Sequence, residues 1–180
     1  AVSGTETASG GGVIGSDPHL PFGVPSTWYE CHLVGPEDDV MGTVFAGAPG
    51  LFFGRNRSLA WGITNNNTSL RDLYIEETDA QGEAFLEGDQ WVPFSTRTID
   101  IPVAGSEQEQ LTIRESSRGP IVNHLLSPVN PEGDPPLALR WVGQQSLDNI
   151  GPLVAMNRAT DWQEFRAALK SWLLPTFNWV

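Results

Sequence analysis

Residues 53–72, FGRNRSLAWGITNNNTSLRD, are the stretch around which the rest of the fold is predicted. Within it, residues 59–64 form a short apolar run around Trp61, which is typical of a β-strand. The run stops at Asn65, where a series of small polar residues is typical of a turn. A strand that ends in this way presents backbone N–H groups at its tip, and such groups can stabilise a developing negative charge. The stretch therefore indicates either an ordinary turn or one side of a catalytic site.

The composition indicates a β-rich globular protein. The chain has 180 residues, which is enough for one domain with a hydrophobic core. Its 19 glycines and 14 prolines favour a β-rich or loop-rich fold over a helix bundle. The formal net charge is −12 with only ten lysine and arginine residues, so nucleic acid is excluded as a partner. The apolar runs are too short to cross a bilayer, so no membrane partner is expected.

Alternation of apolar and polar residues predicts strands along most of the chain. Ile99, Ile101 and Val103 alternate with polar residues and fall on one face of a predicted hairpin or meander. A loop is predicted at 127–136, where proline, aspartate and glycine are frequent. The main predicted strands are 27–34, 40–45, 59–64, 73–78, 96–103, 110–115 and 137–142.

One helix is predicted near the end of the sequence. Residues 160–163 fit a capping box, and Pro175 stops the helix. A shorter helix at 149–157 is a further candidate. Because helices follow many strands, the predicted fold class is α+β with a mainly antiparallel sheet. The apolar residues on one face of the main helix are Trp162, Phe165, Leu169, Trp172 and Leu173.

The residue types that commonly carry catalysis do not by themselves identify a reaction here. Cys31 is the only cysteine, so an internal disulfide and a cysteine-based metal site are excluded, and a packed thiol is expected. His19, His32 and His124 are far apart in sequence; His32 is expected in the core or at its rim. Pro18 fixes the loop that carries His19. On spacing alone the chain is a soluble α+β domain.

Several longer segments carry a family resemblance. They are SDPHLPFGVPSTWYECHLVGP at 16–36, GTVFAGAPGLFFGRN at 42–56 and LAWGITNNNTSLRDLYIEE at 59–77, followed by RGPIVN, LALRWVG and LPTFNWV. In this order they resemble the β-subunit of the penicillin acylase family over nearly the whole chain. The resemblance implies an N-terminal-nucleophile hydrolase fold, an αββα sandwich of which this chain is a part.

The resemblance also implies how such a protein matures and reacts. Members cleave their own precursor, a zymogen, so that a serine becomes the first residue of the β-subunit and attacks an amide, with its own amine as the base. That serine is expected about four residues before Ala1, by the family register. Both ends of the sequence are expected to be cuts inside a larger protein. Residues 1–180 are therefore expected to be a single-domain fragment of the catalytic β-subunit, lacking its first residues and C-terminal portion, and inactive alone.

Three residues gain catalytic roles from the resemblance. Asn178 matches the side-chain amide donor of the oxyanion hole, and Asn65 matches the backbone N–H donor. Loss of one such donor typically raises the barrier by about 3–4 kcal/mol. His19 matches a position that is histidine in the cephalosporin and acyl-homoserine-lactone acylases, where it would orient the serine and its amine.

The acyl-binding pocket implied by the resemblance is apolar. Leu20, Phe52 and Phe53 fall in or near positions that line it. Members that accept glutaryl groups carry an arginine near the place of Phe52, whereas this place is aromatic here. A carboxylate would have no partner in such a slot, so aromatic or aliphatic acyl chains are expected.

A structural Ca²⁺ is the only cofactor that the resemblance implies, and no organic cofactor is expected. Asp72 matches one carboxylate of the family's calcium site. A second carboxylate expected three residues earlier is replaced by Ser69, while the carbonyl of Arg71 remains available as a ligand.

The function predicted by the resemblance is hydrolysis of an N-acyl amide to a carboxylic acid and an amine. The expected partners are the small-molecule amide, the α-subunit of the same precursor and the rest of the β-subunit, in the periplasm or outside the cell. One alternative is an acyl-homoserine-lactone acylase that acts in quorum quenching. Another is a non-enzymatic β-rich module that binds carbohydrate or calcium, and the residues just before Ala1 would distinguish it from an enzyme.

Overall fold

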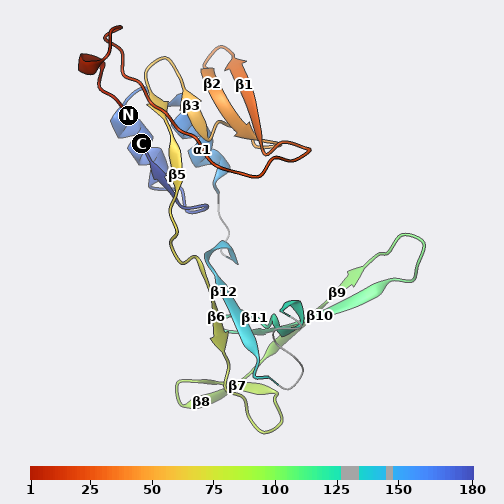
Figure 1. Cartoon of the computed structure of the whole chain (residues 1–180). Helices are drawn as coiled ribbons and strands as arrows, with labels where there is room; N and C mark the ends of the chain where they lie inside the picture. Colours follow the sequence, from red (N-terminus) through yellow and green to blue (C-terminus); the bar gives the residue numbers. More distant parts are fainter. Residues whose placement is uncertain (127–133, 145–147) are drawn as a thin grey trace. The chain divides into compact units, whose positions relative to one another are not determined.

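The computed structural model describes residues 1–126, 134–144 and 148–180, which divide into two compact units. The first unit comprises Ala1–Thr68 and Ser146–Val180, and the second comprises Ser69–Gln145 (Figure 1). The sequence predicts one domain fragment over 1–180, and that extent stays a prediction. In the described parts of the chain, no helix has the length and apolar character needed to cross a membrane.

The first unit contains a four-stranded antiparallel sheet in the order β1-β2-β3-β4. Its strands are β1 (Trp28–Val34), β2 (Asp39–Phe45), β3 (Phe53–Arg55) and β4 (Ala60–Trp61). The register pairs Trp28 with Phe45 at one end of the β1–β2 hairpin and Val34 with Asp39 at the turn. Strands predicted at 27–34 and 40–45 are therefore confirmed, and they form one hairpin around residues 35–38, an acidic turn that carries Glu37 and Asp38.

The predicted strand at 59–64 divides at Gly62 into two short strands with different partners. β4 pairs with β3, whereas β5 (Ile63–Asn65) pairs antiparallel with β13 (Phe177–Trp179). Gly62 exchanges two backbone hydrogen bonds with Val180, at 2.9 and 3.0 Å. The side chain of Ser16 lies where a Cβ on Gly62 would project, which explains why glycine stands where the strand changes partner.

Two α-helices of the first unit are α1 (Ile150–Arg158) and α2 (Trp162–Leu169). The predicted capping box is wrong by one residue, because Asp161 is the N-cap and accepts a hydrogen bond from the backbone N–H of Glu164 at 2.8 Å. The Glu164 carboxylate in turn accepts the backbone N–H of Thr160 at 2.8 Å. α2 ends at Leu169, before the last two residues of the predicted apolar face.

The predicted apolar face of α2 is only partly correct. Phe165 is buried, but Trp162 is 59% exposed because, as the first helical residue, it lies outside the packed part of the helix. Trp172 follows the helix and donates its indole N–H to the carbonyl of Pro175 at 2.6 Å. The buried core of the first unit consists of Val40, Leu51, Trp61, Met156, Ala159 and Phe165, with Phe52, Ile63 and Leu153 forming a second cluster.

The second unit is built from short antiparallel pairs. β9 (Ser95–Ile101), β10 (Glu109–Ser116) and β11 (Gly119–Pro120) form a three-stranded sheet in the order β11-β10-β9. Ile99 pairs with Leu111 and Ile101 with Glu109, which confirms the predicted hairpin. Val103 lies beyond the end of β9, however, and within β9 the predicted apolar face is exposed. The remaining pairs are β7 (Ala84–Glu87) with β8 (Gln90–Pro93), and β6 (Arg71–Ile75) with β12 (Leu137–Trp141).

Short 3-10 helices complete the described elements, at Gly4–Glu6, Asn123–Leu125 and Val142–Gln144. Most of the loop predicted at 127–136 lies outside the described residues. Every described pair of strands is antiparallel, which confirms the α+β class with mainly antiparallel sheets. The four layers of an αββα sandwich stay a prediction.

Candidate active site

A cavity of about 520 Å³ in the first unit brings together several of the residues predicted to act in catalysis. His19 and Leu20 reach it from the loop before β1, and Asn65 reaches it from the end of β5. Pro18, which is expected to fix the loop that carries His19, also lines it, as does Asp17. The other lining residues are Trp28, Phe45, Ile63, Thr64, Pro175 and Phe177.

The β5–β13 ladder determines where the backbone N–H of Asn65 points. Hydrogen bonds join Gly62 with Val180 in both directions, and the N–H of Asn66 donates to the carbonyl of Thr176 at 3.4 Å. Residues directly opposite each other in an antiparallel pair alternate between bonded and non-bonded positions. Asn65, opposite Phe177, therefore occupies a non-bonded position, and its N–H is directed away from β13.

The side chain of Asn178 lies directly across from β5. Its Nδ2 donates to the hydroxyl oxygen of Thr64 at 3.2 Å and approaches the carbonyl oxygen of Asn65 at 3.4 Å. Asn178 is not among the residues that line the cavity, but both of its contacts are. The fold thus brings together the two predicted oxyanion donors, which are 113 positions apart in sequence.

An aromatic cluster forms the apolar wall of the cavity. The rings of Trp28 and Phe45 stack with their centroids 3.9 Å apart, and Phe177 lies on the same wall. Phe52 packs edge-on against Phe45 at 4.6 Å, and Phe53 packs edge-on against Trp28 at 4.7 Å. Of the three predicted pocket residues, Leu20 lines the cavity directly, whereas Phe52 and Phe53 support the rings that line it.

Sequence reasoning did not single out Trp28, Phe45 or Phe177 as pocket residues. Trp28 and Phe45 are cross-strand partners, so the hairpin register around the acidic turn was the signal that could have paired them. For Phe177, the only signal in the sequence was its position next to Asn178. Its pairing with Asn65 depends on β13 reaching β5, which no local pattern indicates.

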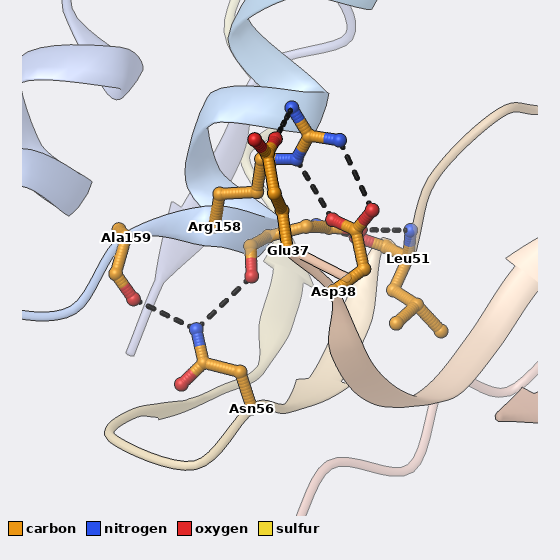
Figure 2. A network of polar contacts seen from close by, with 7 residues as sticks. Glu37, Asp38, Leu51, Asn56, Arg158 and Ala159 are labelled. Atoms are coloured by element: carbon orange, nitrogen blue, oxygen red, sulfur yellow. Dashed lines mark hydrogen bonds and ion pairs between the residues drawn. The ribbon is translucent and has the colours of Figure 1, made fainter. Parts of the chain in front are cut away.

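A buried asparagine connects helix α1 to the segment that carries Phe52. Asn157 accepts the backbone N–H of Leu51 at 2.7 Å and donates to the carbonyl of Leu51 at 2.9 Å. Asn56 in turn donates to the backbone carbonyls of Asn157 and Ala159, at 3.0 and 2.7 Å (Figure 2). The Asn157 bonds fix the loop between β2 and β3, which carries Phe52, against the helix, and the Asn56 bonds fix the turn between β3 and β4 to the end of the same helix.

Charged groups at the surface join the end of helix α1 to the turn between β1 and β2. Figure 2 shows the guanidinium of Arg158 directed at Asp38 and Glu37. Its hydrogen bonds to Asp38, at 2.7 and 3.0 Å, hold the pKa of that carboxyl below its usual range. These side chains are exposed or only partly buried, so they orient the helix end more than they stabilise it.

The residues predicted to bind calcium lie in the second unit. The hydroxyl of Ser69 donates to Asp72 at 3.3 Å, and both residues line a 350 Å³ cavity together with Arg71, Arg118 and Arg140. Ca²⁺ takes six to eight oxygen ligands. Ser69, Asp72 and the Arg71 carbonyl supply only part of that set, and within the described residues no cluster of three or more metal-binding side chains occurs.

Comparison with known proteins identifies the family. The model of the penicillin amidase family matches residues 1–180. The chain belongs to the penicillin amidase family. Its resemblance to that family, first indicated by short motifs, is thereby confirmed over the whole sequence.

Curated relatives within the penicillin amidase family are longer than this chain. The acyl-homoserine lactone acylase QuiP of Pseudomonas aeruginosa is 28% identical over 168 residues, covering 88% of this chain and 20% of the relative. Penicillin acylase 2 proenzyme of Pseudomonas sp. is 28% identical over 186 residues, covering 100% of this chain and 23% of the relative. The chain therefore spans about a fifth to a quarter of the length of these relatives.

A solved structure supports the fold of the family member described above. The thermostable penicillin G acylase from Alcaligenes faecalis matches with a TM-score of 0.68 and 23% identity, over 86% of this chain and 27% of that one. At this identity the match is evidence for the fold alone.

Proposed function

We propose that this chain is part of an N-terminal-serine amidohydrolase that hydrolyses an N-acyl amide to a carboxylic acid and an amine. The observation that carries the proposal is the contact of Asn178 with Thr64 and Asn65, beside an aromatic cavity that also receives His19. Membership of the penicillin amidase family supports the same reaction. It also favours an enzyme over the carbohydrate- or calcium-binding module.

In the proposed reaction, the nucleophile is a serine that precedes Ala1, and its own amine accepts the proton. Attack on the amide carbonyl places a negative charge on the carbonyl oxygen. The backbone N–H of Asn65 and the side-chain amide of Asn178 are the donors that stabilise this oxyanion. His19 at the cavity orients the serine and its amine. The carbonyl then re-forms as the C–N bond breaks, and the departing amine takes the proton held by the serine amine; water next attacks the acyl-serine ester, which releases the carboxylic acid and restores the serine hydroxyl.

The decisive experiment is Asn178→Ala in the full-length, matured protein. Loss of one oxyanion donor should lower kcat by roughly 100- to 1000-fold, with an unchanged folded state. Asn67→Ala is the matched control, because Asn67 is a nearby exposed asparagine outside the lining of the cavity. Turnover by Asn178→Ala close to that of the control would exclude Asn178 as the donor.

The acyl group is proposed to be aromatic or aliphatic. Trp28, Phe45, Ile63 and Phe177 form the wall of the cavity, and Leu20 lies at its rim. A charged acyl group buried against this wall would lose its hydration without gaining a partner there. Phenylacetyl, glutaryl and long-chain acyl amides of one amine should be compared by kcat/KM, and a preference for glutaryl would contradict the assignment.

A second candidate is an acyl-homoserine-lactone acylase, which is favoured by the similarity to QuiP of Pseudomonas aeruginosa. Both candidates use the same chemistry and differ in the amine that leaves. Amides of homoserine lactone and of the penicillin nucleus, carrying the same acyl chain, distinguish them. A ratio of kcat/KM above tenfold in either direction would assign the leaving group.

The proposed protein matures from a precursor and works with an α-subunit and the rest of the β-subunit, in the periplasm or outside the cell. Calcium is proposed as a structural ion at Asp72, Ser69 and the Arg71 carbonyl, with its remaining oxygen ligands from outside the described residues. Metal analysis of the matured protein before and after dialysis against a chelator tests this. A protein without calcium before dialysis would contradict it.

A further inference from the structure

The side chain of Asn178 can donate to an oxyanion only if one of its two amide hydrogens is free and correctly directed. An amide nitrogen carries two hydrogens, and its neighbour, Oδ1, can only accept. A rotation of 180° about the last side-chain bond would exchange the two and remove the donor. Something near Asn178 must therefore select one orientation and hold it.

Thr64 is placed to hold this orientation. Thr64 and Asn178 are direct partners in the β5–β13 register, so their side chains emerge on the same face of the pair. The Nδ2 of Asn178 lies 3.2 Å from the Thr64 hydroxyl oxygen, at the upper end of the normal range for such a bond. Because threonine is branched at Cβ, its hydroxyl is confined to few rotamers and offers a stable acceptor.

The carbonyl of Asn65 selects which end of the Asn178 amide faces β5. This carbonyl oxygen can only accept, and it lies 3.4 Å from Nδ2, longer than a usual hydrogen bond. It would repel Oδ1 in the rotated state, while its own bond to Nδ2 is weak. One amide hydrogen is consequently directed at Thr64, and the second is left for another acceptor.

We propose that Thr64 is a positioning residue, whose hydroxyl oxygen holds one amide hydrogen of Asn178 so that the other is directed at the reacting carbonyl. The inference rests on the proposed amidohydrolase function. Thr64 lines the cavity, so the residue that orients the donor also borders the space where the substrate would bind. Its effect is expected on the chemical step, because the oxyanion exists only after attack.

The test uses Thr64→Val in the full-length, matured protein, since valine keeps the shape of threonine and removes the hydroxyl. Kcat should fall roughly tenfold to a hundredfold with little change in KM, as expected for a donor that is misplaced but present. Thr64→Ser restores the acceptor and should keep kcat within roughly threefold of the unmodified protein. Should valine prevent maturation, Thr64→Ala compared with Thr64→Ser isolates the hydroxyl in the same way.

A double-mutant cycle separates positioning from a structural role. In the Asn178→Ala background, Thr64→Val should cause no further loss of kcat, because the group on which it acts is gone. The inference is overturned if Thr64→Val alone keeps normal kcat, or if its loss persists undiminished in that background.

A neutron crystal structure of Thr64→Val, in which the deuterium atoms on Nδ2 distinguish it from Oδ1, reports on the Asn178 amide independently of any assay. An amide that stays in place would overturn the inference, and a rotated or disordered amide would support it. A matured protein that hydrolyses no amide would instead count against the proposed function, so the two failures remain distinguishable.

Discussion

Replacing Asn157 by alanine should weaken the attachment of helix α1 to the strand loop more than any exposed change nearby. The side chain is 5% exposed, and its two hydrogen bonds, of 2.7 and 2.9 Å, satisfy both the N–H and the carbonyl of Leu51. Leu51 itself is fully buried. The substitution therefore removes both partners of a buried backbone unit and replaces them with nothing.

The magnitude follows from those two groups. A buried donor or acceptor left unsatisfied costs about 1–3 kcal/mol, so the pair amounts to about 2–6 kcal/mol. Water that enters the space left by the amide lowers this to the bottom of the range, about 2–3 kcal/mol. Since 1.4 kcal/mol corresponds to a factor of ten, opening of the loop should become roughly 30- to 140-fold more frequent.

Hydrogen exchange in the full-length protein measures how often the Leu51 loop separates from Asn157. The amide of Leu51 donates directly to Asn157, so a peptide that contains Leu51 should exchange faster by the stated factor. Arg158→Gln is the control, because it changes the next residue of the same helix and removes only ion pairs of a half-exposed side chain. Exchange in Asn157→Ala within threefold of the control would refute the account of how the loop is held.

Two further predictions concern strand β2 of the four-stranded sheet. Gly42→Ala should disrupt the β2–β3 pairing and lower the yield of folded protein. The added Cβ would lie 2.3 Å from the Phe53 carbonyl oxygen, and the φ angle of Gly42 is +154°. Gly15→Ala is the control and should be tolerated, because the space around Gly15 is open. Asp39 accepts hydrogen bonds from His32 and Arg57, and these bonds lower the pKa of its carboxyl. The ionised carboxylate should therefore stabilise the folded state above about pH 4, and this stabilisation should be lost as the pH falls through the lowered pKa. The difference in thermal midpoint between Asp39→Asn and the unmodified protein should therefore shrink on acidification, and a constant difference between about pH 3 and 6 would contradict the assignment.

The acidic turn and its neighbours illustrate what the sequence could predict. The strands that flank this turn could be predicted, because alternation of apolar and polar residues and turn-forming residues are patterns within a few positions of the sequence. The class of the fold followed from many such local signals in order. The capping of α2 was predicted one residue early, since Thr160 and Asp161 are both good caps and only packing decides between them. Periodicity alone places Trp162 on the apolar face of the helix, but periodicity does not indicate where the packed part of that face ends, and Trp162 is exposed.

For the candidate site too, the sequence predicted some features and the tertiary structure decided others. Asn65 and Asn178 were named from motifs, but their contact depends on β13 pairing with β5 across more than a hundred residues. The wall of Trp28, Phe45 and Phe177 likewise needs a hairpin register and a distant strand. No pattern of local hydrophobicity encodes such pairs, because each strand could satisfy its hydrogen bonds with several partners.

By itself, the sequence determined the α+β class, the main β-hairpin and the family to which the chain belongs. These depend on periodicity, turn chemistry and motif order, which are properties of neighbouring residues. The tertiary structure alone decided that residues 59–64 divide at Gly62, that Asn178 reaches Thr64 and Asn65, and that Asn157 satisfies Leu51. Each of these outcomes is a choice of hydrogen-bond partner between distant segments, and that choice is made when the chain packs its core.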